Sequence, residues 1–158
     1  MAESNSTENS LPIPRSAWIL LTCGLWLGVL GLYFMLIRPA LLPEDVRFVG
    51  KPLARIQAAI PELAHWLKLV VVVLGGFATG TGLSSTHLAV VALPHRPRGA
   101  SWVIAVVGLS TVVRMSAVNF GLHSDFRWVL LVPTFLWGAG RAAYLLEDSR
   151  LKPRQRLQ

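Results

Sequence analysis

The sequence is poor in charge, in acids and in cysteine, and each shortage excludes a class of protein. Charged residues make up only 15% of the 158 residues and apolar residues 53%, a composition too apolar for a soluble domain of this size. The single cysteine, Cys23, excludes an intrachain disulfide. Acids number 8 against 15 Lys and Arg. The basic residues flank apolar segments and gather at the C-terminus without interleaved aromatics, so they favour a membrane surface and not nucleic acid as partner.

Four apolar segments are each long enough to cross a bilayer as a helix, which needs about 20 residues. Each begins beside a tryptophan, the residue that favours the membrane interface. The predicted spans are residues 17–37, 67–93, 101–120 and 128–146, with Trp18, Trp66, Trp102 and Trp128 at their starts. The sequence therefore predicts an all-α, polytopic membrane protein built as a bundle of four transmembrane helices.

The ends of the chain differ from this apolar body. Residues 1–16 are polar, hold two glutamates before the first span and lack a basic leader, so we expect a disordered segment followed by a retained helix. Residues 147–158 form a basic tail, which leaves 17–146 as the membrane domain. Basic residues are denser in the short segments on the side of the termini. We therefore predict a multi-pass protein of the inner (plasma) membrane with both termini cytoplasmic.

The loop between the first two spans has a helical pattern of its own. Leu53, Ile56, Ile60, Leu63 and Leu67 recur at intervals of three and four residues, with polar residues between them. The pattern predicts an amphipathic interfacial helix. Proline 61 lacks the amide proton of a continuous helix, which predicts a break near Ile60. The helix would serve as a lid over the helix ends, or else as a partner-binding surface.

Arg114 is the least favourable residue in the predicted spans, because placing an arginine side chain in hydrocarbon costs about 2.5 kcal/mol or more of free energy. No acid lies within a span, so its expected partners are polar groups of the third span or acids of the outer loops. These candidates are Ser110, Ser116 and Asn119 in the span, and Glu44, Asp45, Glu62 and Asp125 outside it. Two interpretations stay open: a structural tether between the outer loops and the bundle, or the anion-attracting centre of a site.

A second polar layer is predicted near the opposite surface. His87 and Arg141 both lie roughly 8–10 Å inside the cytoplasmic boundary by helix rise, and they could face each other. The histidine would act as a proton relay or a ligand, or simply bond a neighbouring helix. It has no second ligand at metal-binding spacing, so the sequence predicts no metal, no cofactor and no catalytic residue.

Glycines spaced four apart mark two helices for close packing. The pairs are Gly24 with Gly28 in the first span and Gly76 with Gly80 in the second. Such pairs permit close approach of neighbouring helices.

The chain resembles the small four-helix bacterial membrane proteins of unknown function that are grouped loosely with DoxX-like proteins. The resemblance covers residues 17–146 and rests on RPALLPEDVRFVG after the first span, GLSTVVRMSA with Arg114, and HSDFRW before the fourth. It implies a bacterial inner membrane and no established activity. Three functions stay open: a non-enzymatic structural or accessory component with a membrane-protein partner, a small homo-oligomeric transporter or channel using Arg114, His87 and Arg141, and an enzyme acting on a lipid or quinone. The first is our leading prediction.

Overall fold

A computed structural model describes residues 12–155, with side chains to residue 151, and every regular element in that part of the chain is helical. The long helices are α1 (Arg15–Leu36), α4 (Leu63–Val91) and α7 (Leu131–Gln155). A further column consists of α5 (Ala100–Gly108), a π-helical segment (Leu109–Val113) and α6 (Arg114–Gly121). Short helices α2 (Pro43–Val49), α3 (Leu53–Ala59) and a 3-10 turn (Leu93–His95) lie in the connections.

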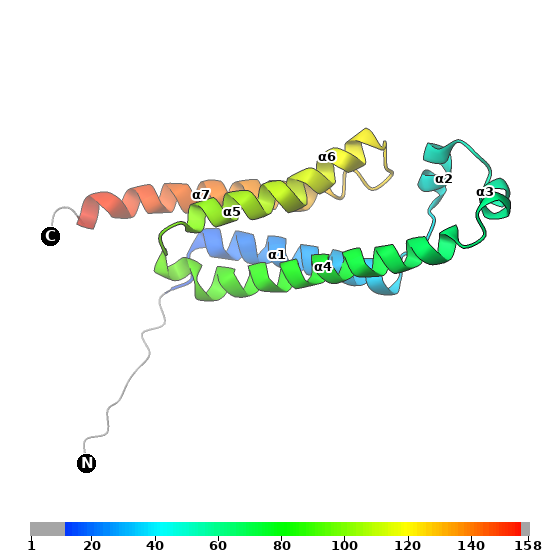
Figure 1. Ribbon diagram of the computed structural model, residues 1–158. Helices are drawn as coiled ribbons and strands as arrows, with labels where there is room; N and C mark the ends of the chain where they lie inside the picture. The colour runs from blue at the N-terminus through cyan, green and yellow to red at the C-terminus, as the bar shows by residue number, and fades with distance from the viewer. Residues whose placement is uncertain (1–11, 156–158) are drawn as a thin grey trace, which may run out of the picture.

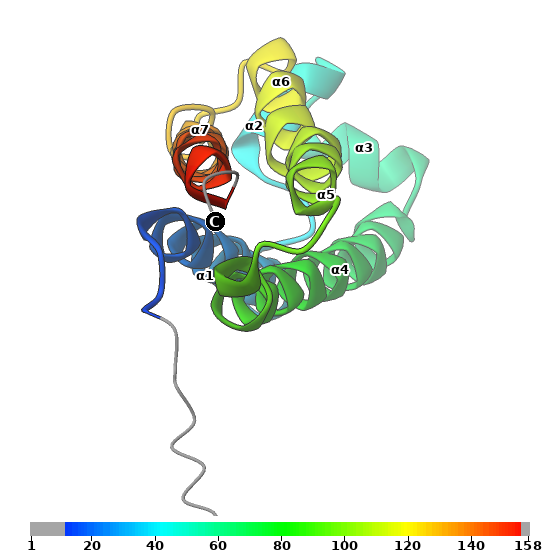
Figure 2. The ribbon, with the colours of Figure 1, turned by 90° about the vertical axis from the view of Figure 1, so that its left-hand side faces the viewer.

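The long helices lie side by side as an elongated bundle (Figures 1 and 2). Helix α1 packs against α4 and α7, and the α5–α6 column packs against α7. The start of α1 and the end of α7 lie at one end of the bundle, which we call the termini end. Helices α2 and α3 lie at the opposite end, which we call the outer end. A small buried cluster that includes Leu20, Leu93 and Tyr144 holds the helices together at the termini end.

Three helical stretches are long and apolar enough to cross a membrane: Arg15–Leu36, Leu63–Val91 and the continuous column Ala100–Gly121. They match the first three predicted spans to within a few residues. Helix α7 lies parallel to them but begins at Leu131, three residues after the predicted start, and includes Glu147 and Asp148. The helix also continues to Gln155 and so takes in most of the predicted tail.

The N-terminal segment predicted to be disordered lies mostly outside the described residues. Residues 1–11 belong to that part, whereas Arg15 and Ser16 already form the first turn of α1.

Small residues form the seam between α1 and α4. On α1 they are Gly24, Gly28 and Gly31; on α4 they are Gly75, Thr79, Gly82 and Thr86. Spacings of three and four residues are typical of a left-handed, coiled-coil-like contact, and glycine lets the two backbones approach closely. A methyl group added at Gly82 would lie 2.6 Å from the Gly24 carbonyl oxygen. The seam therefore requires glycine there.

The close packing predicted at Gly76 and Gly80 is not made among the described residues. A side-chain carbon at either position would meet no atom of that part of the chain within 4 Å. The contact with α1 is made instead by Gly75 and Gly82, one and two residues away. The glycine spacing therefore predicted the correct helix for close packing but the wrong face of that helix for the contact with α1.

The connection between α1 and α4 contains the predicted break. Helix α3 ends at Ala59, Ile60 is not helical, and α4 begins at Leu63 after Pro61 and Glu62. The loop also contains α2, which the sequence reading missed. Helix α2 begins with Pro43, at a position where a helix does not need the amide proton that proline lacks. It ends at Val49 and is followed by Gly50, whose φ of 68° suits glycine.

Candidate functional site

Arg114 lies at the start of α6, immediately after the π-helical segment, and its side chain is exposed on the surface of the bundle. Val112 and Ser116, two residues before and after it, are buried toward α7. Because two residues turn an α-helix by about 200°, Arg114 points away from α7. By helix rise it lies roughly 10 Å from the C-terminal end of α6 and 21 Å from the start of α5.

Side chains exchanged between the π-helical segment and α7 fix this position. The Thr134 hydroxyl donates to the Val112 carbonyl at 2.9 Å, and the Ser116 hydroxyl donates to the Leu130 carbonyl at 2.8 Å. The two hydroxyl oxygens lie 2.7 Å apart. A π-helical turn disturbs the regular ladder of backbone bonds, and hydrocarbon offers no water to satisfy the freed groups. The Thr134 hydroxyl of α7 supplies such a bond to Val112, and together with the bond from Ser116 to Leu130 it sets the rotation of α6.

Trp137 anchors the same pair of helices nearer the termini end. Its indole N–H donates to the Ile104 carbonyl at 2.7 Å, and its ring packs directly on Gly108. A side chain at Gly108 would occupy the same space as the indole. Neither Trp137 nor Gly108 was among the residues that the sequence analysis singled out.

The polar residues expected beside Arg114 bond their own helix. Ser110 donates to the Val106 carbonyl at 2.7 Å, and the Asn119 amide donates to the Met115 carbonyl at 2.9 Å. Both bonds run back about one turn, the usual way in which such side chains are satisfied in a helix. Neither residue contacts the guanidinium of Arg114 through a hydrogen bond.

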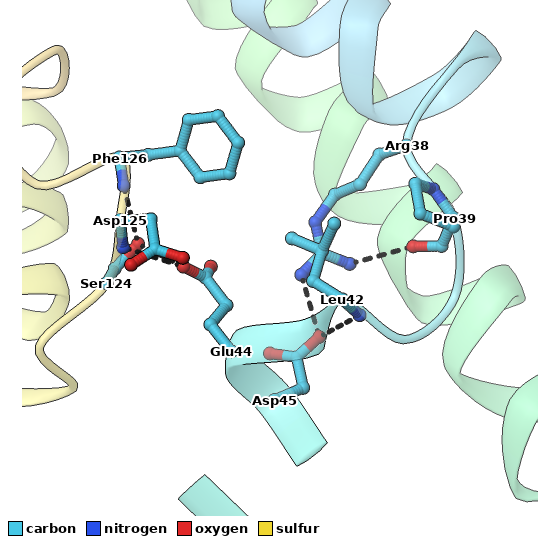
Figure 3. A network of polar contacts seen from close by, with 8 residues as sticks. All are labelled: Arg38, Pro39, Leu42, Glu44, Asp45, Ser124, Asp125 and Phe126. Atoms are coloured by element: carbon cyan, nitrogen blue, oxygen red, sulfur yellow. Dashed lines mark hydrogen bonds and ion pairs between the residues drawn. The ribbon is translucent and has the colours of Figure 1, made fainter. Parts of the chain in front are cut away.

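Three of the acids expected to reach Arg114, namely Glu44, Asp45 and Asp125, belong to a separate network at the outer end (Figure 3). Asp45 accepts the Leu42 amide proton at 2.8 Å, and its carboxylate lies 3.3 Å from the guanidinium of Arg38. The acid reaching back to the residue before the helix is half of a capping box, which explains why α2 begins where it does. Asp45 thus closes the turn after α1.

Glu44 and Asp125 join that turn to the loop after α6. The Glu44 carboxylate accepts the Ser124 hydroxyl at 2.9 Å and the Asp125 amide at 2.8 Å, and Figure 3 shows it reaching from α2 to the loop that holds these residues. The Asp125 carboxylate pairs with Arg47 at 2.6 Å, but both side chains are more than 60% exposed, so this pair stabilises little. Among the described residues, Arg114 therefore makes no ion pair with Glu44, Asp45, Glu62 or Asp125.

His87 and Arg141 do not meet either. His87 is exposed on α4, and no hydrogen bond between described residues joins it to Arg141 on α7. The Nε atom of Arg141 is buried and has no hydrogen-bond partner among the described residues. The predicted second polar layer is therefore not assembled within one protomer.

A polar cluster that the sequence reading missed closes the termini end. The Arg96 guanidinium bonds the Glu147 carboxylate and donates to the Tyr144 carbonyl at 2.9 Å. It also lies 4.6 Å from the centroid of the Tyr144 ring. Ser16, the second residue of α1, donates its hydroxyl to the same carboxylate at 2.7 Å. The cluster joins α1, the loop before α5, and α7.

Its electrostatics favour the charged carboxylate. Burial by itself would raise the pKa of Glu147, but the bonds from Ser16 and the Arg96 cation outweigh burial and lower the pKa below its ordinary value. Arg96 adopts a left-handed backbone conformation (φ 51°), uncommon for a residue other than glycine. No signal in the sequence paired Arg96 with Glu147, because the two residues lie 51 positions apart.

Two cavities accompany these groups. An inner one of about 280 Å³ lies among α1, α4, α5 and α7, with apolar walls that include Leu27, Leu88 and Val103. A larger one of about 1070 Å³ lies at the outer end, between α2, α3 and α4. Neither is lined by Arg114, His87 or Arg141.

A scan of protein-family models, a search of curated proteins and a search of solved structures each give no significant match to this chain. The resemblance to DoxX-like proteins thus stays a prediction based on the residues that suggested it.

Proposed function

We propose that this protein is a non-enzymatic structural or accessory component of a membrane assembly, docked to a partner through the surface that carries Arg114. In this proposal α7 crosses the bilayer as a fourth span, and both termini lie in the cytoplasm of a bacterial cell. The support for a fourth span is that α7 lies parallel to the three apolar stretches and packs on two of them. The support for the orientation is the density of basic residues in the short segments of the termini end.

The exposed guanidinium of Arg114 carries the proposal. It lies within an apolar stretch, is exposed on the side of its helix away from α7, and has no hydrogen bond or ion pair among the described residues. An arginine so placed costs about 2.5 kcal/mol or more in contact with lipid, and polar groups at this depth normally face protein. A partner helix that presents a carboxylate, hydroxyls or free carbonyls would remove this cost.

The open face of α4 offers room for a helix beside this position. Gly76, Gly80 and Ser84 recur every four residues along it and line a shallow groove that also includes Val107 of α5. Small residues at this spacing let another helix approach closely. The groove lies next to the α5–α6 column, so one partner helix would contact both features.

The test is purification of the tagged protein from its native membrane in mild detergent, with native mass measurement and mass spectrometry of co-purifying proteins. We expect a stoichiometric foreign protein with the wild type and with Arg127→Leu, a control at the outer end that lies outside the groove. We expect Arg114→Leu to lose the partner at least about 30-fold, since breaking a buried charge pair costs about 2–5 kcal/mol.

The same variants separate docking from a purely structural role. If Arg114→Leu unfolds at the same denaturant concentration as the wild type but loses its partner, the arginine serves docking. If the variant is instead unstable on its own, or keeps its partner, the proposal is wrong.

A homo-oligomeric transporter or channel is the alternative, and the unpartnered Nε of Arg141 favours it. That atom is a buried donor near the middle of α7 with no hydrogen-bond partner among the described residues, as a group that bonds a ligand or a second copy of the chain would be. A native mass that is a whole multiple of the mass of one chain, with no foreign protein present, would support this alternative.

A further inference from the structure

The outer cavity has apolar walls supplied by five segments. They are the turn after α1, α2, α3, the first three turns of α4, and the turn that follows α6, and include Phe48, Ile56, Leu67, Val70 and Leu122. Its volume of about 1070 Å³ is at the upper end of the range for ligand pockets, about 300–1,000 Å³. The space is therefore large enough for a molecule bigger than a typical metabolite.

The cavity extends from the level of the interface into the depth of the bilayer. Along α4 its lining runs from Leu63 to Leu74, a rise of roughly 16 Å. Trp66 marks the interface, and Leu74 lies about 12 Å further along the helix, within the apolar stretch that can cross a membrane. One end of the cavity thus lies at headgroup level and the other in hydrocarbon.

Charge is confined to the headgroup end. Five charged residues line the cavity, namely Arg38, Glu44, Asp45, Lys51 and Arg55. Arg38 and Asp45 pair with each other, and Glu44 is held by Ser124 and by the Asp125 amide. The exposed side chains of Lys51 and Arg55 make no ion pair or hydrogen bond among the residues the structure describes. Two cations without partners therefore stand at the rim of an apolar space.

We propose that this cavity binds one anionic phospholipid of the surrounding bilayer. Its phosphate lies between Lys51 and Arg55, and an acyl chain lies against Val70, Val71 and Leu74. The positive charges of Lys51 and Arg55 complement the negative charge of the lipid phosphate. Each cation near an anionic headgroup contributes favourably to binding, and arginine binds phosphate esters well. The apolar depth distinguishes this ligand from a soluble phosphate, which would leave the walls from Leu67 to Leu74 empty.

Native mass spectrometry of the full chain tests the proposal. The protein is reconstituted in nanodiscs that contain palmitoyl-oleoyl phosphatidylcholine with a minor fraction of palmitoyl-oleoyl phosphatidylglycerol, then released and scored for retained lipid. We expect one retained phosphatidylglycerol per chain. Lys51→Gln with Arg55→Gln should lower that retention about 30-fold, at about fivefold per removed charge. The control, Arg47→Gln with Arg127→Gln, removes equal charge at the same end outside the cavity and should retain lipid as the wild type does.

A second pair of variants tests the apolar space without changing charge. Ala58 is exposed at the lip of the cavity on α3, so Ala58→Trp should fill it and displace the lipid. The adjacent Gln57→Trp places the same ring outside the lining and should keep the lipid. Equal retention in Ala58→Trp and Gln57→Trp, or equal loss in both charge variants, would overturn the proposal. Because every measurement uses the isolated chain, the result does not depend on docking through Arg114.

Discussion

Two glycines of α4, Gly80 and Gly82, provide a matched pair for testing how α1 and α4 pack. Replacing either by alanine brings the same gain in helix propensity, up to about 1 kcal/mol. At Gly80 the new methyl group meets nothing within 4 Å. At Gly82 it would lie 2.6 Å from the Gly24 carbonyl oxygen and 2.7 Å from the Gly28 α-carbon, well inside the ~3.5 Å of ordinary contacts. Both clashing atoms are backbone, so no side-chain rotation relieves them.

We therefore expect Gly80→Ala to be as stable as the wild type or more so, and Gly82→Ala to be less stable than Gly80→Ala. Forcing one extra carbon into a tight contact costs about 1–3 kcal/mol, and the difference between the two variants isolates this cost. The measurement is reversible unfolding in mild detergent with increasing dodecyl sulfate, followed by tryptophan fluorescence. Equal midpoints for the two variants, or a lower midpoint for Gly80→Ala, would refute the packing described for this seam.

Two further predictions concern residues of α7, Glu147 and Trp137. The lowered pKa of Glu147 means that its contribution to stability is complete above its unfolded pKa of about 4.3 and is lost as the pH falls through the lower folded pKa. Thermal melts from pH 7 to pH 3 should therefore show a falling melting temperature in the wild type. The melting temperature of Glu147→Gln should be lower at pH 7 and should change less over this range. Trp137→Phe keeps the ring but removes the donor to the Ile104 carbonyl, which should cost about 0.5–2 kcal/mol in the same unfolding assay. Trp26→Phe, at a partly exposed site within α1, is its control, and an equal loss in both would show that the hydrogen bond contributes nothing.

The sequence located the helices well because hydropathy and interfacial tryptophans report directly on the bilayer. Three stretches match, and the break near Ile60 follows from the missing amide proton of Pro61. Helix α2 was missed because its seven residues stand alone, whereas the equally short α3 continues its apolar pattern into α4. The pattern of α7 was assigned a shorter helix because apolar periodicity stops near Leu146, whereas the helix itself continues through the polar residues that follow.

The site was harder to predict because rotation about a helix axis is invisible to composition. Arg114 was identified as costly, but its direction depends on the π-helical segment that precedes it and on bonds from Thr134 and Ser116. The acids proposed as its partners were available by depth, yet nearer amides and hydroxyls hold Glu44 and Asp45. Pairing between distant residues, such as Arg96 with Glu147, depends on the folded topology and has no local signature.

The cluster at the termini end has a consequence for the order in which the chain assembles during synthesis. Ser16 is synthesised before its partner Glu147, which follows 131 residues later in the chain. The seam between α1 and α4 closes over a much shorter separation, so the α1–α4 hairpin is available as a template before α7 exists. Only when α7 arrives does its carboxylate join the start of α1 to the loop held by Arg96. A chain that stops before Glu147 would keep the hairpin but leave Arg96 without its carboxylate, a difference that distinguishes unfinished chains from complete ones.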